Sequence, residues 1–91
     1  MKIILLEEVI LSLLDISNYT YLNWGEKQNT IYINSFKEKF ETIATYPRHG
    51  RFIKQQEGFE VRIALHKKHK IIYNLFKNHI LIIRILGQRQ G

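Results

Sequence analysis

The chain has 91 residues, contains no cysteine and carries a formal net charge of +6 at pH 7. This length suits one domain, residues 1–91, around a single core. The lack of cysteine excludes disulfides, thiolate metal sites and a cysteine nucleophile, and fits a cytoplasmic location. Glu7 and Glu8 interrupt the apolar start Met1–Leu6, so we expect a mature, soluble chain with neither a signal peptide nor a membrane span.

The positive charge lies in the second half of the sequence. Residues 1–46 contain four lysines and six acidic residues, a net charge of −2, whereas residues 47–91 contain ten basic residues and two glutamates, a net charge of +8. Clustered charge of one sign repels itself, so this half fits a surface for a polyanion or an acidic protein segment. The alternative is a basic surface that only keeps the protein soluble.

The first half of the sequence predicts a short strand followed by two helices. The strand is the apolar run Lys2–Leu6, and apolar residues then recur at steps of three and four over Glu7 to about Trp24 and over Glu26–Tyr46. Gly25 fits the left-handed residue that ends a helix, which predicts an αα-hairpin. Pro47 must end the second helix, because it lacks an amide hydrogen and its ring clashes with the preceding turn.

The second half predicts three strands after a loop at Arg48–Arg51 and a polar stretch at Lys54–Gly58. Over Phe59–His66 the period is two, which indicates a strand with one buried face. The apolar series is Phe59, Val61, Ile63 and Leu65, and the other series is Glu60, Arg62, Ala64 and His66. We therefore expect Arg62 on the polar face.

Two further strands, Ile71–Phe76 and His79–Leu86, follow turns at His66–Lys70 and Lys77–Asn78. The run Ile80–Ile83 does not alternate, so the last strand is predicted to be central and covered on both faces. Tight turns make the three strands an antiparallel meander, and the first strand joins the same sheet. The predicted fold is α+β, one small sheet covered on one face by two helices.

The histidines and aromatic residues offer candidate sites with simpler alternatives. His66 and His69 have a spacing that metal sites use, but they flank two lysines in a turn with no carboxylate nearby, so we expect solvated turn histidines and no metal or cofactor. A cluster of aromatics around the hairpin could stack on nucleic-acid bases. Because it lies in the acidic half, we expect it to pack in the core and the hairpin; it comprises Tyr19, Tyr21, Trp24 and Tyr32.

A cluster of cations on the sheet is the sharper chemical hypothesis. Arg62, Lys70 and Arg89 could converge on one surface, hold a phosphate and stabilise the charge that develops when a phosphodiester is attacked. RNA cleavage would also need a base, and Glu60 is the only carboxylate predicted on this face. The alternative for Glu60 is an exposed partner of a lysine or arginine.

Three long segments resemble the RelE/ParE superfamily of bacterial toxins from toxin–antitoxin systems. They are MKIILLEEV with LLDISNYTYLNWGEK, then FKEKFETIATYPRHGR, then HKIIYNLFKNHILIIRILGQRQ, and the likeness covers essentially the whole chain in the same element order. Its most specific parts are Ser17-x-Tyr19, Pro47-x-x-Gly50-Arg51, His69–Tyr73 and Ile83–Leu86. The long helical hairpin and the Tyr46–Arg51 connection are closer to the ParE branch than to the RelE branch.

The ParE resemblance implies a toxin that binds DNA gyrase, does no chemistry and is neutralised by a cognate antitoxin protein. The RelE branch implies a ribosome-dependent endoribonuclease that cleaves messenger RNA, with Arg62, Lys70 and Arg89 as cations and Glu60 as base. No aromatic residue follows Phe76, although those nucleases use a tyrosine or histidine near the C-terminus.

A third possibility is an inactive family member. Gly87 stands where many ParE-like chains have histidine, and in this interpretation it marks the lost function. For a docking role, the expected target-binding residues are Arg62, Lys70, Arg84 and Arg89, with RILGQRQG as a docking edge. Arg84 flanks the core strand, so a structural hydrogen bond is its alternative role.

Overall fold

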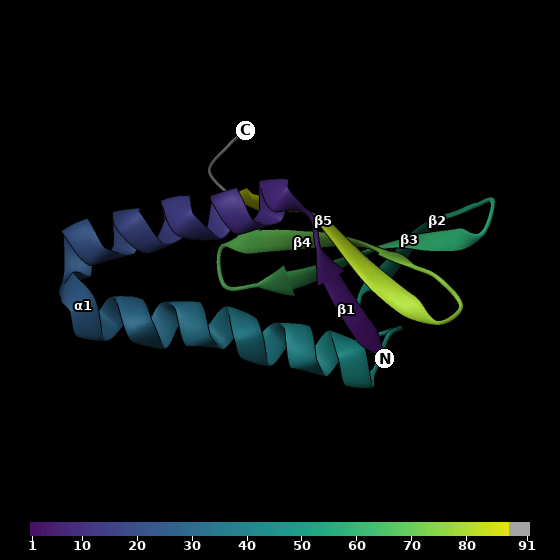
Figure 1. Ribbon diagram of the computed structural model, residues 1–91, viewed down its shortest axis with the longest axis horizontal. Helices are drawn as coiled ribbons and strands as arrows, with labels where there is room; N and C mark the ends of the chain where they lie inside the picture. The colour runs from purple at the N-terminus through teal and green to yellow at the C-terminus, as the bar shows by residue number, and fades with distance from the viewer. Residues whose placement is uncertain (88–91) are drawn as a thin grey trace.

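The computed structural model describes residues 1–87 and has one five-stranded sheet packed against a helical hairpin (Figure 1). The elements in chain order are β1 (Lys2–Leu5), α1 (Glu7–Thr45), β2 (Arg51–Gln56), β3 (Phe59–His66), β4 (His69–Leu75) and β5 (His79–Gly87). The sheet order is β1-β5-β4-β3-β2, with β1 parallel to β5 and the other pairs antiparallel. The predicted α+β class and the place of the first strand in the sheet are confirmed.

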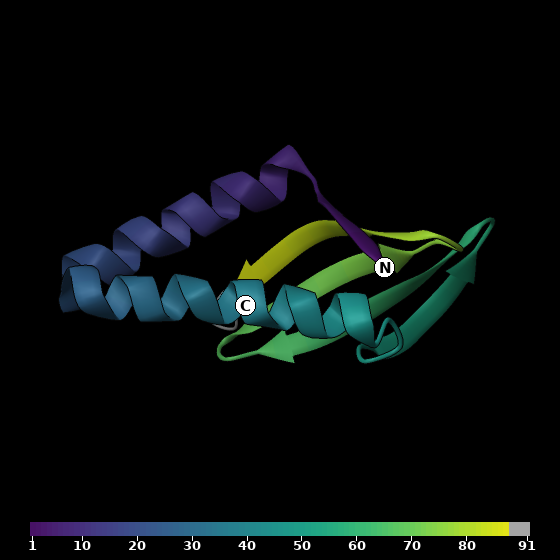
Figure 2. The same ribbon diagram turned by 60° about the horizontal axis from the view of Figure 1, so that its bottom comes forward.

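The helical hairpin turns at Gly25, as the sequence predicts. The structure assigns α1 as one helix of 39 residues, but Gly25 inside it has φ 88° and ψ 176°. Only glycine adopts this backbone conformation without strain, because it has no Cβ. Figures 1 and 2 show the two halves of α1 running side by side in opposite directions, with the closed end of the hairpin beyond the sheet.

The strand β2 is missing from the sequence prediction, which assigns its residues to a loop and a polar stretch. In the structure β2 pairs with β3 along the edge of the sheet, so the meander has four strands. All six residues of β2 are exposed. Backbone hydrogen bonds to one neighbouring strand hold β2 in the sheet. Because none of its side chains is buried, its sequence shows no alternation of apolar and polar residues.

The buried face of β3 is the opposite of the predicted one. Arg62 and Ala64 are only 9% and 2% exposed, whereas Leu65 is 67% exposed. The register explains this, because Arg62 lies opposite Tyr73 and Ala64 lies opposite Ile71, both of which are fully buried. The period of two separates the faces of a strand but does not say which face meets the helices.

The core lies between α1 and one face of β3, β4 and β5. Its buried apolar members are Val9, Phe36, Phe40, Ile43, Ala64, Ile71, Tyr73, Leu75, Ile80, Ile82 and Ile85. The sequence predicts that the last strand is central. In the structure β4 is the middle strand, and β5 lies between β4 and β1. The last strand is therefore interior but not central.

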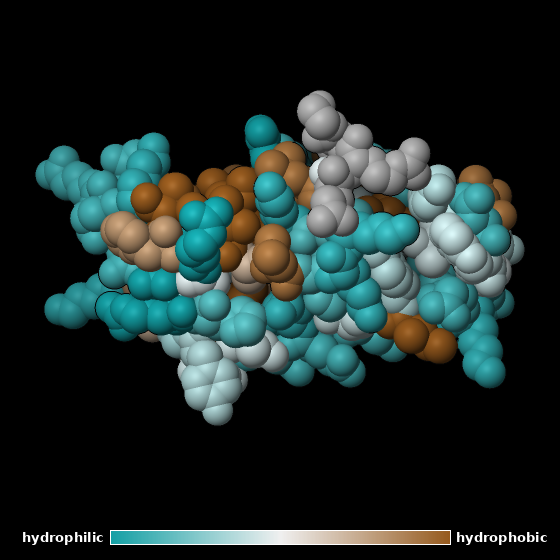
Figure 3. Space-filling view, turned by 180° about the vertical axis from the view of Figure 1, so that it is seen from behind, coloured by the Kyte–Doolittle hydropathy of each residue, from teal (hydrophilic) through white to brown (hydrophobic). Residues whose placement is uncertain are grey.

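Apolar side chains also occupy the other face of the sheet, which α1 does not cover. The register pairs Ile63 with Ile72 there, and these side chains are half-buried by their neighbours alone. Seen from behind, the molecule has a group of hydrophobic side chains on its surface (Figure 3). No helix within residues 1–87 is long and apolar enough to cross a bilayer.

Candidate functional site

The sheet cations do not converge as the sequence predicts. Lys70 lies opposite Leu65 in the register, whereas Arg62 lies opposite Tyr73. Successive side chains of a strand point to opposite faces, so Lys70 and Arg62 project from different sides of the sheet. Arg89 lies outside the described residues. The expected surface with Arg62 and Lys70 side by side is therefore wrong.

Arg62 is buried, and its Nε and Nη1 groups donate to other residues of the chain. Its Nη1 donates to the carbonyl oxygen of Gly50 at 2.7 Å, and its Nε donates to Oε1 of Glu60 at 2.8 Å. The guanidinium also lies over the ring of Phe52, 5.6 Å from its centroid. A second guanidinium, that of Arg48, lies 3.7 Å from Oε2 of Glu60. Glu60 is thus the partner of two arginines. The side chains of Arg62 and Glu60, both on β3, hold the loop before β2 in place.

Tyr73 holds the same loop from the core side. Its hydroxyl donates to the carbonyl oxygen of Pro47 at 2.7 Å and accepts from the backbone N–H of Gly50 at 2.9 Å. Burial raises the pKa of Tyr73 above its usual value, which keeps the phenol protonated and able to donate. A Cβ on Gly50 would lie 2.7 Å from the Tyr73 hydroxyl oxygen and 3.0 Å from the backbone of Ile63. Glycine is therefore required where the motif Pro47-x-x-Gly50-Arg51 places it.

Arg84 connects the last strand to the start of the helix. Its Nε donates to Oε2 of Glu8 at 3.1 Å, and the two side chains are 54% and 55% exposed. An ion pair this exposed contributes little to stability. The hydrogen bond that the sequence offers as the structural alternative for Arg84 is present.

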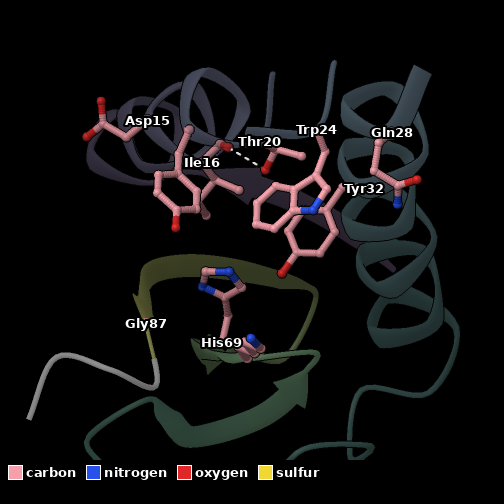
Figure 4. A pocket seen from close by; sticks show the side chains of 10 residues that line it. Asp15, Ile16, Thr20, Trp24, Gln28, Tyr32, His69 and Gly87 are labelled. Atoms are coloured by element: carbon pink, nitrogen blue, oxygen red, sulfur yellow. Dashed lines mark hydrogen bonds between the residues drawn. The ribbon is translucent and has the colours of Figure 1, made fainter. Parts of the chain in front are cut away.

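A groove opens between the closed end of the hairpin and the sheet. It has a volume of about 770 Å³ and is lined by Asp15, Ile16, Tyr19, Thr20, Trp24, Gln28, Tyr32, Lys68, His69 and Gly87. Figure 4 shows Trp24 and Tyr32, from the two halves of α1, pointing toward His69 of β4, with Gly87 at the edge. The walls are mainly aromatic and aliphatic, which suits an apolar group of a partner more than an ion.

Three of the four hairpin aromatics are exposed, so the predicted packing in the core is wrong for them, whereas the predicted packing in the hairpin holds for Tyr19 and Trp24, whose rings meet edge-on at 5.9 Å between centroids. Tyr19, Tyr21 and Trp24 are 53%, 54% and 62% exposed. Only Tyr32 reaches the core, where its ring packs edge-on against Phe36 at 5.8 Å between centroids. Tyr19 and Trp24 line the groove between the hairpin and the sheet, and this open space leaves them accessible to solvent.

The two turn histidines are packed rather than solvated, which corrects the expectation for both. The His66 ring lies 4.6 Å from the Phe36 centroid, and its Nε2 lies 2.8 Å from Oγ of Ser35. Burial, together with the smaller effects of Lys39, Lys67 and His69, lowers the pKa of His66 to about 4. Burial also lowers the pKa of His69. Within residues 1–87 no three acidic, histidine or cysteine side chains gather as a metal site.

Comparison with known proteins gives one family and a common fold. The family model of the ParE toxin of the type II toxin–antitoxin system, parDE, matches residues 3–91. A chain of the chromosomal ParDE toxin–antitoxin system from P. aeruginosa is similar in structure, with a TM-score of 0.74, 12% identity and coverage of 96% of this chain and 95% of that one.

A chain of the archaeal RelE–RelB complex from Pyrococcus horikoshii OT3 is also similar. Its TM-score is 0.73 at 11% identity, over 99% of this chain and 97% of that one. A search of curated protein sequences gives no match. At such low identity, both structural likenesses establish the fold alone.

The Tyr73 hydroxyl should contribute measurably to stability. Tyr73→Phe leaves the buried N–H of Gly50 and the carbonyl of Pro47 without their partner, which should cost about 2 kcal/mol of unfolding free energy. Urea denaturation measures this loss. Tyr46→Phe is the matched control, because Tyr46 is 66% exposed. Equal stability of the two variants would contradict the role of the hydroxyl.

The stability of the chain should fall with acidification through His66. Its folded pKa is about 4 against a usual value of 6.5, so between these values the unfolded chain binds the proton more readily and stability decreases as pH falls. Between pH 7 and pH 5, wild type should lose about 1 kcal/mol more than His66→Gln. His49→Gln serves as the control and should follow wild type. Parallel curves for wild type and His66→Gln would refute this assignment.

Proposed function

The chain belongs to the ParE toxin family of type II toxin–antitoxin systems, and from this premise we propose that it inhibits DNA gyrase and is neutralised by a cognate antitoxin. The resemblance found in the sequence is thereby confirmed at the level of the family. In this proposal the protein acts in the cytoplasm by binding gyrase, and it catalyses no reaction.

The placement of Glu60, Arg62 and Lys70 supports a binding role over a nuclease role. A phosphodiester-cleaving site needs a free base and preorganised cations around one reacting group. Here the Glu60 carboxylate lies against two guanidinium groups, and Arg62 donates to a backbone carbonyl. Lys70 projects from the opposite face of the sheet. Lys70 and the undescribed Arg89 remain the candidate target contacts.

The first half of α1 supports the presence of a protein partner. Apolar residues lie on more than one side of it: Val9 is buried, whereas Leu11, Leu14 and Leu22 are 54%, 56% and 80% exposed. Exposed apolar patches of this kind mark interaction sites. We assign this surface and the adjoining groove to the antitoxin.

The antitoxin segment that fits is apolar and folds as it binds. The similar structures were solved as a ParDE system and a RelE–RelB complex, that is, toxins of this fold with antitoxins. A helix laid into a hydrophobic groove uses apolar anchors on one of its faces. Acidic residues elsewhere in such a segment would be attracted by residues 47–91, which carry a net charge of +8.

Parallel assays of the purified chain test the activity. We expect inhibition of gyrase-catalysed supercoiling and no cleavage of messenger RNA on programmed ribosomes. The protein encoded by the adjacent reading frame should relieve the inhibition. Ribosomal cleavage without an effect on gyrase would refute the proposal in favour of the nuclease, and inactivity in both assays would indicate an inactive member of the family.

Truncation of Trp24 tests the groove as the antitoxin site. The side chain is 62% exposed in the groove wall, so Trp24→Ala should leave folding intact. If the antitoxin packs on it, affinity measured by calorimetry should fall at least about tenfold, as for aromatic hot spots. Tyr46→Ala, at the other end of α1 and 66% exposed, is the control. Equal affinities of the two variants would place the antitoxin elsewhere.

A further inference from the structure

A small polar hollow lies between the second half of α1 and the β3–β4 turn. It has a volume of about 270 Å³ and is lined by Ser35, Glu38, Lys39, Thr42, His66 and Lys67. The proposed toxin and antitoxin roles make no use of it. Two ammonium groups, two hydroxyls and an imidazole from segments distant in sequence surround it, against a single carboxylate.

Neither lysine of the hollow forms an ion pair with a carboxylate of the described residues. Within residues 1–87 every ion pair uses an arginine, so neither Lys39 nor Lys67 is paired. Both act on the imidazole between them, since each lowers the pKa of His66. The hollow therefore has a positive potential that an anion would relieve.

Lys67 occupies its place in the turn at some cost. Its φ of 56° is the only positive value at a non-glycine residue in the described chain. Left-handed backbone is unfavourable for a residue with a side chain, and glycine or asparagine adopts it more easily. The geometry of the turn does not favour lysine at this position. A binding role of the Lys67 ammonium group would explain why lysine stands there.

The hydrogen bonds of the hollow leave one ring nitrogen of His66 available. The Ser35 hydroxyl donates its only proton to the carbonyl oxygen of Tyr32 at 2.5 Å, so the contact to His66 at 2.8 Å requires Nε2 of the imidazole to donate. Nδ1 then has the free lone pair. An anion held by the two lysines would favour protonation of Nδ1 and gain a third cationic donor.

From this arrangement we propose that the hollow binds a phosphate group of a nucleic-acid backbone. The cationic surface continues beyond it, which suits a chain of phosphates. Nζ of Lys39 lies 3.0 Å from Nε2 of His49, and the neighbouring Arg48 side chain is 73% exposed. Phosphate contacts of this type give affinity without base specificity, through release of counterions.

Binding of a short fluorescein-labelled DNA duplex, followed by anisotropy at increasing salt, tests the site. The double variant Lys39→Gln/Lys67→Gln should bind about tenfold more weakly, and its salt slope should fall by about two. Lys27→Gln/Lys77→Gln removes the same charge at the hairpin end and the β4–β5 turn and should change affinity much less. Equal losses in the two double variants would overturn the proposal.

A gain-of-binding variant guards against a folding artefact. Glu38→Gln removes the only carboxylate of the hollow, so it should strengthen duplex binding about twofold or more at unchanged melting temperature. No gain would count against the site. The gyrase result does not influence these measurements, because the duplex is offered without gyrase.

Titration of His66 by NMR separates a nucleic-acid site from a free-phosphate site. The charged groups around its ring are Lys39 and Glu38 of α1 and Lys67 of the turn, with titratable His69 beside it. The duplex should raise the His66 pKa in wild type and not in Lys39→Gln/Lys67→Gln. If inorganic phosphate raises it while the duplex does not, the hollow holds a free phosphate and the nucleic-acid proposal is overturned.

Discussion

The buried hydroxyl of Tyr73 is the contact on which the arrangement of the second half of the chain depends. It joins the end of α1 to the start of β2, because it donates to Pro47 and accepts from Gly50. Arg62 completes the junction from β3 by donating to the same Gly50 residue. A loop held by three hydrogen bonds, two of them buried, fixes where the helical hairpin enters the sheet. The motif that first suggested the family is thus a structural joint.

The use of Arg62 in this joint changes the functional interpretation of the sheet. A buried guanidinium needs internal acceptors, and here Glu60 accepts from Nε and the carbonyl oxygen of Gly50 accepts from Nη1. The same contacts hold Arg62 and Glu60 against the loop before β2, which supports the proposed binding role. The positive surface that remains comes from residues at the edges and turns, such as Arg48 and Lys67. This distribution favours the recognition of anionic partners over catalysis.

The helical hairpin has more apolar surface than the sheet covers. Its closed end extends past the sheet, which opens the groove and exposes Trp24 (Figures 2 and 4). The opposite face of the sheet is likewise apolar and is left uncovered by α1. In water such surface favours association. The monomer therefore has the physical character of one component of a complex, in agreement with its family.

The sequence by itself determined the elements with strong local rules, and tertiary structure decided the rest. The hairpin turn follows from Gly25, the end of the helix from Pro47, and the strand β3 from its period of two. The edge strand β2 gives no such pattern, because a single neighbour pairs it through its backbone. The burial of Arg62 and the exposure of Trp24 depend on which distant elements lie over them. Local periodicity separates the faces of a strand or helix, but only packing selects the face that is buried.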